Sequence, residues 1–206
     1  MEREPFAQSV KTGIRFVWHD KVLLSAMTLD MFSVLFGGAV AVLPIYADQV
    51  LHVGATGLGI LRSAPALGSL LILLLLGLRP LKVISGKMLL WVVAGFGLTT
   101  LLFGISTNFT LSLIFLAASG AFDGVSMVIR STILQLRTPD HVRGRVSAVS
   151  TVFITSSNEI GAFESGFAAK VLGLVPSVAF GGVMTLLIVA ATALFYPELR
   201  KKEIRE

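Results

Sequence analysis

The sequence predicts an all-α, polytopic membrane protein with six transmembrane helices, and three observations carry this prediction. First, 54% of the 206 residues are hydrophobic and only 14% are charged, whereas a soluble domain carries about 25% charged residues. Second, six apolar runs reach the roughly 20 residues needed to cross about 30 Å of hydrocarbon. Third, the basic residues gather in short clusters between those runs. Lipid is therefore the expected surroundings of most of the chain.

The six spans can be placed in chain order, together with the segments that flank them. The expected spans are residues 22–46, 56–78, 88–106, 109–134, 146–172 and 176–196. Residues 1–21 are expected to form a cytoplasmic amphipathic linker segment, 22–196 the transmembrane bundle and 197–206 a basic cytoplasmic tail. The first 21 residues carry charges throughout and resemble no cleavable signal peptide, so the first span is expected to direct insertion itself.

The direction of insertion follows from the basic residues, because Lys and Arg in short loops are retained in the cytoplasm. All but three of the 17 Lys and Arg residues lie before the first span, in residues 79–87, in residues 137–145 or in the tail. The opposite connections, 47–55, 107–108 and 173–175, contain none. The chain is thus predicted to lie in the inner (plasma) membrane with both termini in the cytoplasm.

Several classes of chemistry are excluded by what the sequence lacks. The absence of cysteine excludes thiol catalysis, disulfides and cysteine-rich metal sites. Gly86-Lys87 lacks the upstream glycine of a phosphate-binding loop, and the three histidines show no metal-ligand spacing. We therefore expect no enzymatic activity, no cofactor and no metal. Basic residues that cluster at membrane borders also argue against nucleic acid as a partner.

Ionisable residues inside the spans are the candidates for function, since each costs ~2.5 to 3.5 kcal/mol at mid-helix. Asp123 and Glu159 fall near the middle of their spans, Asp30 toward the cytoplasmic third and Glu164 toward the outer third. Arg62 lies near the outer end of the second span. We expect these residues to line the transport pathway: an acid carries a coupling proton, and Arg62 pairs with it or meets an anionic substrate group. The alternative is a set of static charge pairs.

A second group of charges is expected to form a cytoplasmic gate. It lies at the inner end of the fourth span and in the connection to the fifth, near Asp30, and consists of Arg130, Arg137, Asp140, Arg143 and Arg145.

Small residues four apart allow helices to approach closely in lipid. Gly120 and Gly124 in the fourth span and Gly161 and Ser165 in the fifth have this spacing, and we interpret them as helix-packing positions. In addition, Phe36-Gly37-Gly38 recurs as Phe122-Asp123-Gly124, 86 residues later. An offset of about three spans is what a 3+3 inverted repeat gives.

Two stretches resemble a known family: residues 29–71, and residues 136–166 with their Arg-Thr-Pro-Asp-x-x-Arg-Gly-Arg loop and following Ser-Asn-Glu-x-Gly-x-Phe-Glu-Ser-Gly. They resemble the C-terminal half of major facilitator superfamily permeases, with the transmembrane secretion effector branch, which includes enterobactin-exporter-like proteins, as the most similar. The resemblance implies export of a drug or siderophore-like small molecule, coupled to proton entry, by alternating access between two six-helix bundles.

Such transporters have about twelve spans, and this chain has six. The expected partner is therefore a second six-helix half: another copy of this chain, a separately encoded N-terminal half, or a missing portion of the same gene. The alternative interpretation is a non-transporting membrane fragment or an interaction subunit derived from a split permease.

Overall fold

The structure, a computed structural model, describes residues 6–79, 81, 84–201 and 203–204, and over these it confirms the all-α class. Arg3, Lys82, Lys202 and Arg205 of the predicted charge pattern lie outside the described residues. The helices are α1 Phe6–His19, α2 Lys21–Gly37, η1 Ala39–Val42 (a 3₁₀ helix), α3 Leu43–Gln49, α4 Gly54–Leu78, α5 Gly86–Ile105, α6 Phe109–Arg137, α7 Asp140–Leu172, α8 Leu174–Phe195 and α9 Pro197–Lys201. Two short strands, β1 Ile84–Ser85 and β2 Glu203–Ile204, pair antiparallel.

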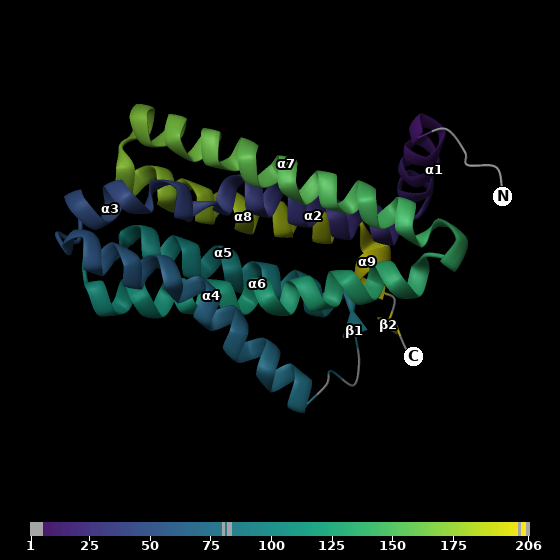
Figure 1. The fold of residues 1–206 in the computed structure, drawn as a ribbon, viewed down its shortest axis with the longest axis horizontal. Coiled ribbons are helices and arrows are strands. Elements are labelled where there is room, and N and C mark those ends of the chain that lie inside the picture. The colour runs from purple at the N-terminus through teal and green to yellow at the C-terminus, as the bar shows by residue number, and fades with distance from the viewer. Residues whose placement is uncertain (1–5, 80, 82–83, 202, 205–206) are drawn as a thin grey trace.

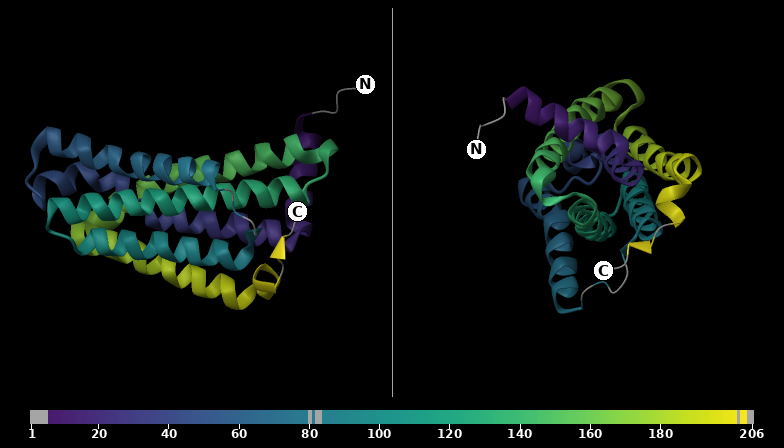
Figure 2. Two further views of the ribbon diagram at one scale, coloured as in Figure 1. Left: turned by 90° about the horizontal axis from the view of Figure 1, so that it is seen from below. Right: turned by 90° about the vertical axis from the view of Figure 1, so that its right-hand side faces the viewer.

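The long helices run side by side in one elongated bundle, with α1 lying across one end of it (Figures 1 and 2). α2, α7 and α8 form one side of the bundle, and α4, α5 and α6 form the other (Figure 1). α1 and α9 lie at the same end, which we call the terminal end, and the opposite end is the far end.

The first predicted span is one crossing but not one helix. α2 ends at Gly37, Gly38 leaves the helical region with φ −73° and ψ 55°, and the chain continues through η1 into α3. Two successive glycines weaken the helix at this point. Pro44 lies in the first turn of α3, where proline is favoured because it has no N–H to donate. The break exposes backbone to the middle of the bundle.

Five helical segments among the described residues are long and apolar enough to cross a membrane: Lys21–Gln49, Gly54–Leu78, Gly86–Ile105, Phe109–Arg137 and Leu174–Phe195. α7 has 33 residues, which corresponds to about 50 Å, yet it is not among the five because it is more polar. It runs alongside α2 and α8 within the bundle. The count of six spans therefore stays a prediction, with α7 as the helix on which it depends.

The helices pair in the way that a 3+3 repeat predicts. In such a repeat α2 corresponds to α6, α4 to α7 and α5 to α8. The contact between α4 and α6 then corresponds to that between α7 and α2, and the contact between α5 and α6 to that between α8 and α2. All four contacts are extensive. The repeated glycines occupy related places. A Cβ on Gly124 of α6 would lie 2.8 Å from Oγ of Ser69 on α4, and one on Gly38 would lie 3.7 Å from Oγ of Ser165 on α7.

Two clusters of buried apolar residues hold the bundle, one at each end. At the far end, the fully buried Tyr46 of α3 donates its hydroxyl toward three carbonyls at the end of α5, those of Phe103, Gly104 and Ser106, at 3.1, 3.0 and 2.9 Å. The last carbonyls of a helix have no partner within it. Tyr46 therefore ties the far end of the first span to the end of α5.

The predicted linker and tail both fold against the terminal end. Gly13 of α1 lies so close to α7 that a Cβ there would be 2.8 Å from the Arg145 carbonyl, and Val17 is buried. Leu199 of α9 is also buried, against Gly86. The β1–β2 pair joins the tail to the connection between α4 and α5.

Candidate transport site

The centre of the candidate site is Arg130 on α6, which lies between two carboxylates. Its Nη1 pairs with Oδ2 of Asp30 on α2, and its Nη2 lies 3.8 Å from Oδ1 of Asp123, two turns earlier on α6. Its Nε donates to Oγ of Ser126 at 3.2 Å. The exposed fraction of the side chain is 7% for Asp30, 15% for Arg130 and 53% for Asp123. Arg130 thus pairs with one buried carboxylate, that of Asp30, and one half-exposed carboxylate, that of Asp123.

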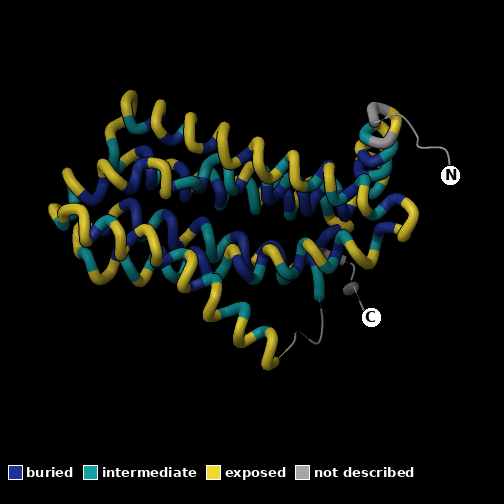
Figure 3. Tube along the Cα trace, viewed as in Figure 1, coloured by how far each residue is buried: buried dark blue, intermediate teal, exposed yellow. Residues whose placement is uncertain are grey.

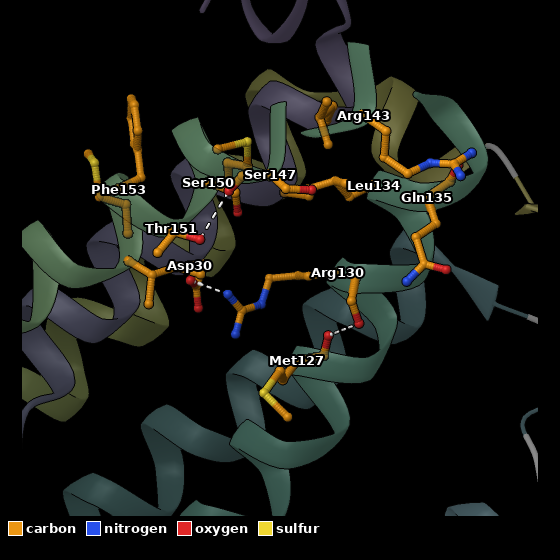
Figure 4. A pocket seen from close by; sticks show the side chains of 16 residues that line it. Asp30, Met127, Arg130, Leu134, Gln135, Arg143, Ser147, Ser150, Thr151 and Phe153 are labelled. Carbon is orange, nitrogen blue, oxygen red and sulfur yellow. Dashed lines mark hydrogen bonds and ion pairs between the residues drawn. The ribbon is translucent and has the colours of Figure 1, made fainter. Parts of the chain in front are cut away.

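Figure 4 shows the first cavity at the site, which Asp30 and Arg130 both line. Asp30 and Arg130 face each other from α2 and α6, and Ser150 and Thr151 of α7 lie on the same cavity. The cavity has a volume of about 320 Å³, lies toward the terminal end and is also lined by Ser131, Gln135, Arg143 and Ser147. Hydroxyls, an amide and two guanidinium groups give it many hydrogen-bonding positions.

A second cavity, of about 370 Å³, lies further toward the far end. Its walls include the broken segment around Gly38, and its polar side chains include Arg62, Ser119, Asp123 and Asn158. Asp123 therefore lines this cavity, whereas Asp30 and Arg130 line the first. The charge cluster lies where the two cavities approach each other.

The five predicted pathway residues divide into two groups. Asp30 and Asp123 meet at Arg130, a residue expected at the gate. Arg62 is exposed and lines the second cavity, as Asp123 does, but forms no ion pair with a described residue. Glu159 is exposed and Glu164 half-buried on α7, and neither pairs with a cation in the described part of the chain. At the level of Glu159 it is the neighbouring Asn158 that lines the cavity.

The predicted gate residues form two further ion pairs, separate from the one at Arg130. Nε of Arg137 lies 2.7 Å from Oδ2 of Asp20, and Nη2 of Arg143 lies 2.6 Å from Oδ1 of Asp140, one turn away. Arg143 also reaches the carbonyls of Gln135 and Thr138, both at 3.3 Å. The connection between the fourth and fifth spans is shorter than expected, because only Thr138 and Pro139 separate the helices: Arg137 ends α6, and Asp140, Arg143 and Arg145 lie in α7.

Sequence reasoning missed Asp20. Its Oδ1 accepts the backbone N–H groups of Val22 and Leu23 at 3.0 Å each, so it caps α2 while it holds Arg137. The signal was present, since an aspartate directly before a long apolar run is a common helix cap. Its partner on α6 could not be read from the sequence, because 117 residues separate the two.

The predicted packing residues lie at two close helix contacts. A Cβ on Gly120 would collide with the Pro65 carbonyl of α4. A Cβ on Gly161 would lie 2.8 Å from the Leu35 carbonyl of α2, and Oγ of Ser165 donates to the Gly38 carbonyl at 3.3 Å. These contacts hold α4 on α6 and α7 on α2, and so fix the walls of both cavities.

Comparison with known proteins places this arrangement in a family. Residues 1–206 match a protein family that is described as transmembrane secretion effector. The chain is 27% identical over 199 residues to an enterobactin exporter EntS of Escherichia coli O1:K1, covering 97% of this chain and 48% of the relative. It is 30% identical over 188 residues to the enterobactin exporter EntS of Shigella flexneri, covering 88% of this chain and 46% of the relative. No solved structure matches.

The chain thus spans about half the length of the curated relatives it matches. The match to the family, by contrast, extends over the whole chain. With its membrane-length apolar helices, the chain is a multi-pass membrane protein. It belongs to the transmembrane secretion effector family of major facilitator superfamily transporters.

Proposed function

We propose that this chain is one half of a secondary active transporter that exports a small molecule in exchange for protons. The observation that carries the proposal is the Asp30–Arg130–Asp123 cluster between two polar cavities. Paired charges inside a membrane protein mark substrate and ion pathways. The relatives are named for export of enterobactin, which favours a siderophore-like substrate, with a drug-like molecule as the broader class.

The partner in this proposal is a second six-helix half. The chain covers 46–48% of the length of relatives that are named as exporters. Polar side chains of α2, α4, α6 and α7 line the two cavities. A second bundle packed against these helices would enclose the cavities between the halves. The partner is another copy of this chain, a separately encoded half or the remainder of a longer chain.

The orientation in this proposal follows from the retention of Lys- and Arg-rich loops in the cytoplasm. The bundle lies in the inner membrane of a bacterium, with the terminal end on the cytoplasmic side. The first cavity is then the cytoplasmic one, and the second is nearer the outside. The Arg137–Asp20 and Arg143–Asp140 pairs flank the cytoplasmic mouth. They are proposed to break and re-form as that mouth opens and closes.

Proton coupling in this proposal uses the shared arginine. Protonation of one of the two carboxylates weakens its ion pair with Arg130, and the guanidinium group then pairs with the other carboxylate. Because Asp30 and Asp123 line different cavities, the move of Arg130 links proton entry to exposure of one cavity or the other. Arg62 is proposed to meet an anionic group of the substrate, with Glu159 and Glu164 as further acids on the outer part of α7.

The test is efflux from bacteria that lack their own exporters. The chain is produced alone and together with a second half, and export of a catecholate siderophore and of a fluorescent cationic dye is measured with and without an uncoupler. We expect uncoupler-sensitive efflux that Asp123→Asn abolishes, whereas Glu159→Gln, which changes an acid outside the Arg130 cluster, is expected to lower it less. If no combination exports either compound although the chain is inserted and folded, the alternative of a non-transporting interaction subunit is favoured.

A further inference from the structure

A groove on the other side of the bundle, away from the proposed transport site, has the features of a lipid site. It lies between α5 and α8, has a volume of about 300 Å³ and is lined by Lys87, Leu90, Trp91, Ala94, Val189 and Ala193. Every lining residue except Lys87 is apolar. The two proposed transport cavities are lined mainly by other helices, so a second half placed over them leaves this groove facing the membrane.

The groove exists because the packing between α5 and α8 changes along their length. Toward the far end the helices are in close contact: a Cβ on Gly97 would lie 2.9 Å from Cγ2 of Thr185, and one on Gly104 would lie 2.8 Å from the Ala179 backbone nitrogen. Nearer the terminal end, Ala94 and Ala193 face the groove with short side chains. The space they leave is lined by apolar side chains, as an acyl chain requires.

The mouth of the groove combines a cation with an exposed indole. Lys87 is exposed in the first turn of α5 and forms no ion pair with any residue that the structure describes. Trp91, one turn further, is 78% exposed. Tryptophan is enriched where the headgroups meet the hydrocarbon, and one helical turn corresponds to about 5 Å of depth. The ammonium group therefore lies at the level of lipid phosphates when the indole lies at this boundary.

Lys87 lies at the terminal end of the bundle, close to the tail. β1 ends immediately before α5, and its pairing with β2 joins the tail to this connection. Basic pockets between transmembrane helices on the cytoplasmic side bind anionic headgroups.

We propose that the α5–α8 groove is a binding site for one anionic phospholipid, with an acyl chain between Ala94 and Ala193 and the headgroup phosphate on Lys87. Charge complementarity selects the anionic class over zwitterionic lipids. The site does not depend on what is transported, but its exposure to lipid rests on the proposed position of the second half.

The test uses Trp91 as the reporter, since the chain has only two tryptophans. A Trp18→Phe variant of the whole chain is reconstituted in phosphatidylcholine bilayers. Phosphatidylglycerol or phosphatidylcholine with brominated acyl chains is then added in steps, because bromine quenches indole fluorescence only near contact. We expect phosphatidylglycerol to be preferred about fivefold, the factor that about 1 kcal/mol per basic residue near the surface gives.

Two variants and one control separate the headgroup from the groove. Lys87→Gln is expected to lower the preference to about one while quenching by both lipids persists. Ala94→Leu fills the groove and is expected to weaken quenching by both. Lys170→Gln removes an exposed cation from the last turn of α7, at the far end, and is expected to leave the preference unchanged.

The proposal is overturned if the parent shows no preference for phosphatidylglycerol, or if Lys87→Gln retains it. Absence of quenching by either lipid overturns it as well, because the groove is then covered by protein. Lipid retained after mild detergent extraction provides a second measurement. The ratio of phosphatidylglycerol to phosphatidylethanolamine, determined by mass spectrometry, should fall in Lys87→Gln if that variant gives too little reconstituted protein.

Discussion

At the scale of the residue, Arg130 lies between two carboxylates that differ in exposure, with Asp30 buried and Asp123 half-exposed. Depth along each span can be estimated from the sequence, and on this basis both acids are predicted to be intramembrane charges. It also marked Glu159, which forms no ion pair among the described residues. What distinguishes Asp30 and Asp123 from Glu159 is the side of its helix on which each acid lies relative to the neighbouring helices. That relation is set by the packing of the helices.

Arg130→Gln is predicted to destabilise the protein by about 3 kcal/mol, because it leaves the Asp30 carboxylate buried without its cation. The double variant Asp30→Asn/Arg130→Gln removes both charges and is predicted to recover much of the loss. The midpoint of thermal unfolding in one detergent measures the difference. Equal midpoints for the single and double variants would show that the pair is not what holds α2 to α6.

Tyr46→Phe is predicted to cost about 1 to 2 kcal/mol in the free energy of unfolding, because the carbonyls at the end of α5 lose a buried donor. Tyr196→Phe is the matched control, since the chain has only two tyrosines and Tyr196 is only half-buried. Thermal unfolding again provides the readout, and a larger effect at Tyr196 would contradict the prediction.

At the scale of the element, close helix contacts decide the shape of the two cavities. α4 crosses α6 at Gly68 and Gly120, where an added Cβ would collide with backbone of the facing helix. Beyond this crossing, α4 leaves the bundle toward the terminal end and is mostly exposed there (Figures 1 and 3). The spacing of small residues in the sequence indicated that close helix contacts exist. It did not indicate which two helices form each contact.

Gly120→Ala is predicted to lower the yield of folded protein and the unfolding midpoint, because its methyl group meets the Pro65 carbonyl and rigid backbone must move. Gly166→Ala on α7 is the control: a Cβ there meets nothing within 4 Å, and alanine favours a helix by about 1 kcal/mol over glycine. Size-exclusion profiles and melting curves compare them. The prediction is contradicted if Gly120→Ala is as stable as Gly166→Ala.

At the scale of the whole molecule, the polarity of α7 is explained by its position beside the two cavities. α7 is less apolar than the other long helices because it contains polar residues along its length. These include Ser147, Ser150, Thr151, Thr155, Asn158 and Glu159. Several of these line the cavities. A helix that faces a polar cavity needs fewer apolar residues than one surrounded by lipid, so its polarity agrees with a spanning position inside a two-half assembly.

The absence of cysteine allows a direct test by labelling. Single cysteines at Thr107 and Leu172, both exposed at the far end, are predicted to react with a membrane-impermeant maleimide in intact cells. A cysteine at His141, exposed at the start of α7, is predicted to react only after permeabilisation. Labelling of Leu172→Cys and His141→Cys from the same side would show that α7 does not span, and the reverse pattern would overturn the orientation.

The sequence by itself determined the class of the fold and, within a few residues, the positions of the long helices. Apolar length and the glycines, prolines and charges that interrupt it are local properties, so they can be read without knowing what any helix contacts. Local signals also marked Asp30, Asp123 and Arg130 as charges that need partners.

Only the tertiary structure decided how those residues combine. Asp30 and Arg130 are 100 positions apart in the chain, and their pairing depends on which helix faces which. The break after Gly37, the separation of Asp123 from Glu159 and the groove beside Lys87 depend on contacts between distant segments in the same way. The physical reason is that burial and pairing are properties of neighbours in space, which the order of residues along one helix does not specify.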